Sequence, residues 1–340
     1  MSKPTILDVA KAAGVSLGTA SRVINGHESV NPTMKAQVEK TIRQLGYRPD
    51  AVAQSMRRKS TRAIGIMVRD FTVPGFVNFV KSVQGILYDA GYVLILAGSE
   101  DKIERESEIL NAFSERRADG LILTTAAEND RDLTKARLAL TVPVVMLDRE
   151  PCENHDAILI AHRDGMLQAM GYLFELGHRR IALVTGDPNM RPARERIIGY
   201  TDAYQRSGHS IDTSLIRTRN FTAEYAFAET SALLSNPNPP TAIIAGGVGM
   251  LRGVLRAIKI CNLKIPHDVS VIGSTDSDLS ELMIPAVTVV QVDYHNIGVE
   301  SAQLLLDRLN NKVQRGGHII KFGSSLIIRE SCAPPRADHK

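Results

Sequence analysis

Residues 5–25, TILDVAKAAGVSLGTASRVIN, have the pattern of two short helices joined by a tight turn. Val9 belongs to an apolar face of the first helix, and Gly14 stands where the chain must turn. Ser16 is a favourable N-cap for the second helix, which has Val23 on its inward side. The stretch therefore predicts a helix-turn-helix, a motif that places its second helix in the major groove of DNA.

Charge supports this interpretation over an ordinary helical hairpin packed in a core. Residues 1–62 contain eleven Lys or Arg and four Asp or Glu, a net charge of +7. The whole chain carries +4, so the remaining residues carry −3. A basic excess gathered at one end of a chain is what binding to phosphates requires.

Length and composition limit the remaining possibilities. A chain of 340 residues can form two or three domains. It has no apolar run of membrane-spanning length, and its first residues lack the apolar region of a signal peptide. Its three cysteines are far apart and without metal-ligand spacing, so we expect a reduced cytoplasmic protein, associated with the nucleoid, without a metal or cofactor. The absence of Trp argues against stacking on single-stranded bases.

A third helix is predicted after the helix-turn-helix. It starts at Asn31 and Pro32, and its apolar stripe consists of Val38, Ile42 and Leu45. With this helix the sequence predicts a DNA-binding domain over residues 1–49.

Residues 50–60 are short, basic and capped by Asp50, with Val52 and Met56 on one face. A helix this short is marginal alone, so we expect a hinge that folds on DNA with Met56 as an apolar wedge. A plain linker, in which Met56 only packs, is the alternative.

From residue 61 to residue 340 the pattern changes to an α/β core. Amphipathic segments such as 76–90 and 197–207 separate short β-rich runs. The expected strands are 64–68, 93–96, 121–123, 144–147, 181–184, 242–245 and 269–272. This alternation predicts doubly wound parallel sheets, and the series is long enough for two similar lobes with a small-molecule cleft between them.

Short motifs that occur together along the whole chain carry a resemblance to a known family. They are SRVING (21–26), GYRP (46–49), STRAIG (60–65), ADGLI (118–122), VPVVMLDR (142–149), LGHRRIA (176–182), IPHDVSVIG (265–273) and RES (329–331). The chain resembles the lactose-repressor (LacI/GalR) family of transcription regulators. The resemblance implies an all-α helix-turn-helix head on a periplasmic-binding-protein-like core, a homodimer on a pseudo-palindromic operator, a small-molecule effector and no enzymatic activity. Fold analogy places one lobe at about residues 62–161 plus 293–322, and the other at 162–290 plus the C-terminal strand.

The resemblance also assigns DNA contacts. Leu17, Gly18 and Arg22 occupy base-reading positions, and Arg22 can make a bidentate contact to guanine. Leu17 offers apolar contact and Gly18 no side chain, so specificity is expected from Arg22, Leu17, Thr19 and DNA shape. Met56 stands where many members insert a Leu into the minor groove. The full set of expected DNA contacts is Thr5, Ser16, Leu17, Gly18, Thr19, Ser21, Arg22, Asn25, Tyr47 and Met56, among which Ser21, Asn25 and Tyr47 are expected on phosphates.

Matching positions give the expected effector site. It consists of Phe76, Asp148, Arg194, Arg196, Phe221, Thr275 and Tyr294. Arg196, in a loop that enters a helix, can clamp oxygen atoms, and Phe221 can stack on a ring face. Structural roles at a lobe edge are the alternative for each.

Two departures from sugar-sensing relatives bear on the effector. Gly247 and Val248 stand where those relatives have Asn-Asp, and Thr275 stands where they have the first Asp of an Asp-Asp pair. Both changes remove partners for sugar hydroxyls while Arg196 remains. We therefore expect an anionic effector, such as a sugar acid or a sugar phosphate, with Arg69, Arg149 and Arg194 as further candidate contacts.

Two other classes of protein remain as alternatives. The run GVGMLRG at 247–253, with Asp276 downstream, fits a weak dinucleotide-binding pattern, although close packing of a strand–helix turn explains the glycines equally. A solute-binding protein shares the expected core but does not need the basic residues 1–62. We expect no catalytic residues, and we expect His178 to serve the fold. The chain lacks a C-terminal leucine heptad for association beyond a dimer.

Overall fold

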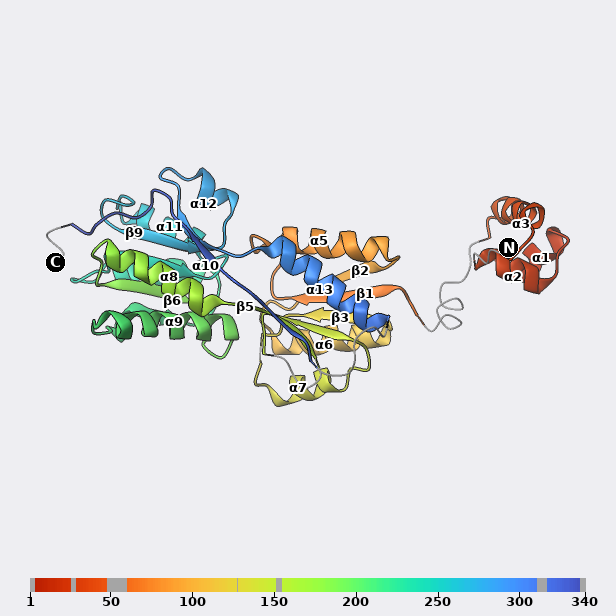
Figure 1. The fold of residues 1–340 in the computed structure, drawn as a ribbon, viewed down its shortest axis with the longest axis horizontal. Coiled ribbons are helices and arrows are strands. Elements are labelled where there is room, and N and C mark those ends of the chain that lie inside the picture. The colour runs from red at the N-terminus through yellow and green to blue at the C-terminus, as the bar shows by residue number, and fades with distance from the viewer. Residues whose placement is uncertain are drawn as a thin grey trace. The chain divides into compact units, whose positions relative to one another are not determined.

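The computed structural model describes residues 4–25, 29–47, 60–126, 128–150, 155–310 and 317–336. The chain divides into two compact units, Met1–Thr61 and Arg62–Lys340, called here the head and the core (Figure 1). The expected hinge helix, including Met56, lies outside the described residues, apart from Ser60 at its end. Among the described helices, none is both long enough and apolar enough to span a membrane.

The head consists of three helices, α1 (Ile6–Ala12), α2 (Leu17–Ile24) and α3 (Pro32–Leu45). Thr5 and Asp8 form a reciprocal capping box at the start of α1. At the start of α2 the backbone N–H of Thr19 donates to Ser16 Oγ over 3.1 Å, which confirms Ser16 as the N-cap. The helix-turn-helix is therefore formed by local signals that the sequence carries.

A small apolar cluster holds the head together. It consists of Val9, Ala13, Val23, Val30 and Val38, with Val15, Ile42 and Tyr47 packed against it. Leu45, expected on the inward stripe of α3, is instead 38% exposed, and Thr41 is buried in its place. Thr41 lies three residues after Val38, where the helix brings the same face inward again.

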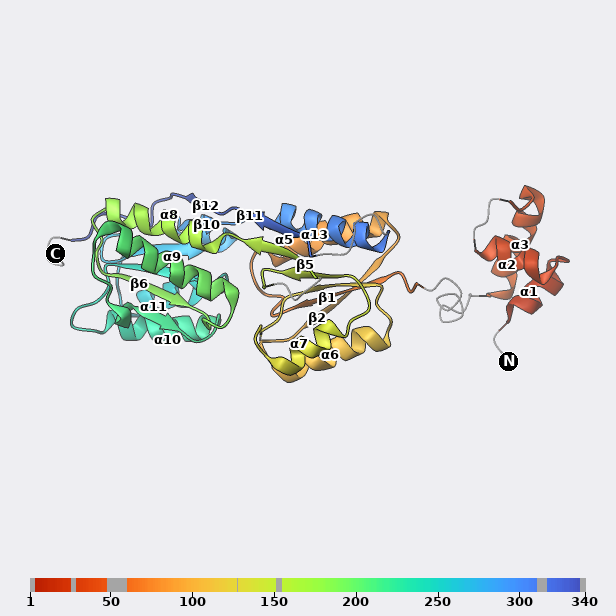
Figure 2. The same cartoon turned by 60° about the horizontal axis from the view of Figure 1, so that its bottom comes forward.

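The first lobe of the core (lobe 1) is built on a parallel sheet with the strand order β11-β5-β4-β3-β1-β2. Its strands are β1 (Ala63–Val68), β2 (Val93–Gly98), β3 (Gly120–Leu123), β4 (Val144–Leu147), β5 (Asp156–Ile160) and β11 (Ile319–Phe322). Its helices are α5 (Phe76–Asp89), α6 (Ile103–Glu115), α7 (Arg131–Leu138) and α13 (Tyr294–Leu309). In Figures 1 and 2, α5 and α13 cover one face of this sheet and α6 and α7 cover the other.

The second lobe (lobe 2) has the strand order β12-β10-β9-β8-β6-β7, in which only the β10–β12 pair among the described strands is antiparallel. Its strands are β6 (Ile181–Thr185), β7 (Ile216–Thr218), β8 (Ala242–Gly246), β9 (Ser270–Ser274), β10 (Thr288–Gln291) and β12 (Ser325–Ile327). Its helices are α8 (His162–Glu175), α9 (Arg191–Ser207), α10 (Ala223–Leu234), α11 (Leu251–Ile260), α12 (Asp278–Leu282) and the short 3-10 helix η1 (Thr213–Leu215).

Each face of each sheet has its own apolar cluster. Residues of α5 and α13 pack on one face of lobe 1 and residues of α6 and α7 on the other. In lobe 2, α8 and α9 cover one face, and α10 and α11 cover the other. These clusters exclude water from both sides of each sheet, which is the arrangement that parallel sheets require.

The described chain passes between the lobes after β5, after β10 and between β11 and β12. The two α/β lobes and their expected bounds agree with this structure. Each of the expected strands is present, and β12 is the C-terminal strand expected in lobe 2, but β5, β7, β10 and β11 were not predicted. Helix α9 begins at Arg191 rather than at residue 197, because Pro192 is accommodated in its first turn. Arg196 therefore lies within a helix and not in a loop before it.

Candidate functional site

A cavity of about 130 Å³ lies between the two lobes. For scale, an apolar cavity of about 150 Å³ holds a benzene-sized molecule. Strand ends build the wall, since Arg69 and Asp70 follow β1, Asp148 and Arg149 follow β4, and Gly247 follows β8. The carboxyl ends of parallel strands are the usual place for a ligand in such folds.

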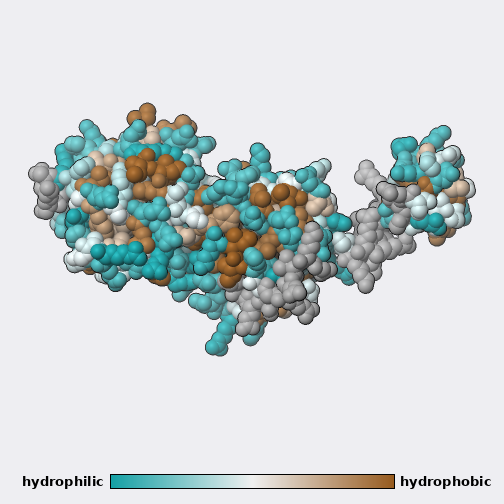
Figure 3. Space-filling view, viewed as in Figure 1, coloured by the Kyte–Doolittle hydropathy of each residue, from teal (hydrophilic) through white to brown (hydrophobic). Residues whose placement is uncertain are grey.

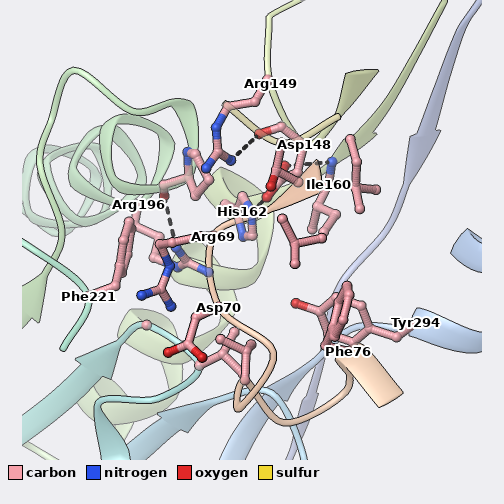
Figure 4. A pocket seen from close by; sticks show the side chains of 17 residues that line it. Arg69, Asp70, Phe76, Asp148, Arg149, Ile160, His162, Arg196, Phe221 and Tyr294 are labelled. Atoms are coloured by element: carbon pink, nitrogen blue, oxygen red, sulfur yellow. Dashed lines mark hydrogen bonds and ion pairs between the residues drawn. The ribbon is translucent and has the colours of Figure 1, made fainter. Parts of the chain in front are cut away.

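Aromatic side chains face this cavity from opposite sides (Figure 4). Phe221 of lobe 2 lies on one side, and Phe76 and Tyr294 of lobe 1 lie on the other. The Arg69 guanidinium is 5.8 Å from the centre of the Phe221 ring. Burial raises the pKa of Tyr294, so its hydroxyl remains protonated and can donate a hydrogen bond. The arrangement can hold a ring between apolar faces.

Asp148 is a polar group of the cavity wall with several partners. It is held with a φ of +54°, and its carboxylate accepts from His162 Nε2 at 2.7 Å and from Arg191 Nη1 at 3.0 Å. Burial alone would raise the pKa of Asp148, but the contact and hydrogen bond with His162 and the charges of Arg149 and Arg191 lower it below its ordinary value. Asp148 is therefore a carboxylate with its charge largely satisfied within the protein.

His162 was not predicted to line a ligand cavity. It is the first residue of α8, directly after the unpredicted strand β5, so no sequence motif marked it. Burial and the nearby Arg196 charge lower the pKa of His162 to about 4. The ring is neutral at pH 7, and its Nε2–H donates to Asp148.

Arg196 differs from the other arginines around the cavity. Its guanidinium is buried, and within the described residues its only hydrogen bond is from Nη1 to the Pro192 carbonyl oxygen, without an ion pair. Arg149, by contrast, donates to two backbone carbonyls and lies 3.6 Å from Glu128. The Asp148 carboxylate acts on the Arg196 charge only through space, without a direct ion pair. Arg196 can therefore still donate to an anionic or strongly polar ligand group.

The structure does not gather every expected effector residue. Phe76, Asp148, Arg196, Phe221 and Tyr294 line the cavity together, with the additional candidates Arg69 and Arg149. Arg194 does not line it, and instead pairs with Glu128 and Glu150 at 3.4 Å. Thr275 lines an adjoining hollow that also includes Tyr294 and the acidic residues that follow β9.

The glycine run at 247–253 is explained by packing. A Cβ on Gly247 would lie 2.5 Å from the Phe221 ring, and one on Gly253 would overlap the Ala223 carbonyl oxygen of α10. These glycines let α11 approach α10 and leave room for Phe221. Close packing therefore accounts for the pattern that a dinucleotide site would also have needed.

The head presents a second candidate surface. Leu17, Gly18 and Arg22 are exposed on α2. A Cβ added at Gly18 would lie 3.8 Å from Arg22 Nη2, an ordinary van der Waals distance. Thr5, Ser16 and Thr19 take part in helix caps, and Asn25 donates to Ser21. Tyr47 packs against the apolar cluster of the head.

Comparison with known proteins settles the family. Residues 5–50 match the family described as bacterial regulatory proteins, lacI family, and residues 170–332 match the periplasmic binding protein-like domain. The ribose operon repressor of Escherichia coli K12 is 33% identical over 307 residues, which cover 90% of this chain and 93% of that protein. The chain belongs to the lacI family. A second relative, the repressor PurR of Pectobacterium carotovorum, is 30% identical over 339 residues, or 99% of each chain.

Solved structures of lacI-family proteins have the same architecture. The lac repressor dimer bound to operator and the anti-inducer ONPF superposes with a TM-score of 0.85 at 26% identity, covering 98% of this chain and 100% of that chain. A lacI-family regulator from Enterococcus faecium with bound ribose gives 0.70 at 26% identity, over 81% of this chain and 100% of that one. The head and the two-lobed core are therefore the DNA-binding and effector-binding parts of a lacI-family protein.

Proposed function

We propose that this lacI-family protein is a transcriptional repressor that binds a pseudo-palindromic operator as a homodimer and responds to an anionic effector. The observation that carries the proposal is the combination of an exposed recognition helix with a cavity whose buried Arg196 has no ion pair within the described residues. The proposal includes a cytoplasmic location and no catalytic activity. The relatives named above are repressors, which favours repression over activation.

Operator binding is supported by the exposed face of α2. Arg22 is the side chain of this face that can read guanine in the major groove, while Leu17 offers apolar contact to a thymine methyl group. Because Gly18 adds no side chain, the predicted discrimination rests on few direct contacts and on DNA shape.

Dimer formation is supported by apolar side chains left exposed on both lobes. Val77 and Tyr88 of α5 and Val93 of the edge strand β2 are each more than two-thirds exposed. In lobe 2, Leu282 is 78% and Ile284 is 95% exposed at the end of α12. Figure 3 shows apolar surface on both lobes of the core. A second copy of this chain covers such surfaces in the proposed dimer.

An anionic effector is supported by the charge and shape of the cavity. Arg196 supplies unpaired donors, and Arg69, at 3.8 Å from Asp101, supplies a second guanidinium beside Phe221. Phe76, Tyr294 and Phe221 accommodate a ring. Ligand binding between the lobes changes their closure, and in the proposed dimer this alters the spacing of the two hinge segments and so operator affinity.

Selection from a random pool of duplexes tests the DNA part of the proposal. The purified protein should enrich a two-fold symmetric sequence, and its affinity should fall steeply as the salt concentration rises. Sedimentation at the concentration used for binding should give a dimer. Failure to bind any duplex more tightly than random DNA, with the head folded, would contradict the proposal.

Thermal-shift measurements test the effector class. Sugar acids and sugar phosphates should raise the melting temperature of the core, and Arg196→Gln should remove this response while leaving the unliganded protein folded. Arg206→Gln, at the exposed end of the same helix, is the matched control. Stabilisation by neutral sugars alone would show that the anionic class is wrong.

A further inference from the structure

The start of α9 lacks a cap from its own lobe. Its N-cap residue is Met190, which makes no side-chain cap hydrogen bond. Glu128 of lobe 1 fills this role, because its Oε1 accepts from the backbone N–H of Arg191 at 2.8 Å. A carboxylate at a helix N-terminus both satisfies a free N–H and interacts favourably with the helix dipole. The cap of a lobe 2 helix is thus supplied by lobe 1.

Further ion pairs join the same two parts. Arg191 Nη1 donates to Asp148 Oδ1 at 3.0 Å and to the Ile160 carbonyl oxygen at 2.9 Å. Arg194 Nη2 lies 3.4 Å from both Glu128 Oε2 and Glu150 Oε1. Each of these contacts runs between a lobe 2 arginine and a lobe 1 oxygen. Separation of the lobes would therefore break all of them together.

Burial makes these contacts strong. The Glu128 side chain is 4% exposed and that of Arg191 is 8% exposed, so little water can replace either partner. Glu150 is 53% exposed, and its pairs are correspondingly weak. Removal of one partner from a buried pair leaves an uncompensated charge, which is strongly unfavourable.

We infer that Glu128, Asp148 and Glu150 of lobe 1, with Arg191 and Arg194 of α9, form an interlobe clamp that holds the two lobes together. Glu128 is a positioning residue at its centre. Arg196, five residues after Arg191 on α9, and Asp148 and Arg149 line the cavity. Lobe closure and the placement of ligand-binding groups are therefore set by one group of ion pairs. The inference concerns the core alone and does not depend on the nature of the effector or on DNA binding.

Distance measurement between the lobes by double electron–electron resonance tests the clamp without a ligand. Spin labels are attached at Lys135→Cys of α7 and Gln205→Cys of α9, both exposed positions, after the native cysteines are replaced by Ala. Labelled protein is diluted with unlabelled protein so that each observed distance lies within one chain. Protein with the unmodified clamp should give one narrow distribution of distances between the two labels.

Glu128→Gln should add a longer-distance population and raise the ratio of open to closed molecules about tenfold or more. Arg194→Gln, at a more exposed position, should raise it about threefold, and Arg194→Lys should stay close to the parent protein. Glu229→Gln is the matched control, because it removes a carboxylate that pairs with Arg217 inside lobe 2, and it should leave the distribution unchanged.

An unchanged distribution in folded Glu128→Gln and Arg194→Gln proteins would overturn the clamp, and so would an equal response of Glu229→Gln. If Glu128→Gln does not fold, Arg194→Gln decides the question alone, since the Arg194 side chain is one-third exposed and its replacement should leave the core folded. Because the readout needs neither effector nor operator, its failure is distinguishable from a failure of the proposed function.

Discussion

The head and the core differ in how many polar side chains they bury. Among the described residues of the head, Thr41 is the only buried polar side chain, and the base-reading candidates Leu17, Gly18 and Arg22 are exposed outside a small apolar cluster. The core buries many charged groups, including Glu106, Arg137, Arg191 and Arg196. The head thus presents its candidate contacts on an external surface, whereas the core carries its candidate ligand contacts inside. Substitutions should therefore affect the two units through different forces.

The largest effect is expected from a charge in the head cluster. Val38→Asp places a carboxylate where the side chain is fully buried, at a cost of about 3 kcal/mol or more. Because the head has a small cluster, it should unfold and duplex affinity should be lost, while calorimetry shows an unchanged transition for the core. Met34→Asp, at a half-exposed position of the same helix, should leave helicity unchanged. Joint loss of both transitions would mean that the units are not independent.

The next largest effect is expected on operator affinity, from a substitution on the exposed face of α2. Arg22→Ala should weaken binding to a selected guanine-containing operator by about 1–3 kcal/mol, roughly 5- to 150-fold, and reduce preference at that base pair. Fluorescence anisotropy with operator and random duplexes measures both. Arg43→Ala, also exposed on the head, should change the two affinities equally. An equal loss on both duplexes for Arg22→Ala would place Arg22 on phosphate instead.

Acid should affect the core before the head. Burial lowers the pKa of His178 to about 4, below its ordinary value of 6.5, so the unfolded chain binds the proton more readily than the folded one. The stabilising contribution is complete above pH 6.5 and is lost as the pH falls towards 4. The melting temperature of the core should fall by several degrees across this window, and His178→Asn should flatten the change. His267→Asn, exposed on the same lobe, is the control.

The smallest effect is at a helix cap. Ser16→Ala removes the oxygen that accepts from Thr19 and should destabilise the head by about 1 kcal/mol. Chemical denaturation followed by circular dichroism measures it, and Ser16→Asn should retain most of the stability. A shift of the core transition would contradict the separation of the two units.

Local patterns predicted the head well because its determinants are local. The turn at Gly14, the cap at Ser16 and the inward Val23 lie within ten residues, and each is present in the structure. Leu45 was placed inward wrongly, because the end of an apolar stripe is ambiguous by one turn.

The core was predictable in architecture but not in its polar contacts. Resemblance supplied Asp148, Arg196 and Phe221, and the structure brings them to one cavity. Sequence alone did not mark Glu128 or His162. Glu128 lies in a loop, and its hydrogen-bond partner Arg191 is 63 residues away, so only the folded chain brings the two together. The short strands β7 and β10 were missed because three or four residues carry little periodicity.

The passages of the chain between the lobes have a consequence for synthesis. Lobe 1 begins with β1 but needs α13 and β11, which leave the ribosome after nearly all of lobe 2. Until then, Phe79, Val83 and Leu87 of α5 lack the α13 residues that share their apolar cluster. The nascent chain therefore exposes apolar surface for most of its translation. A chain that ends before residue 294 keeps that surface exposed.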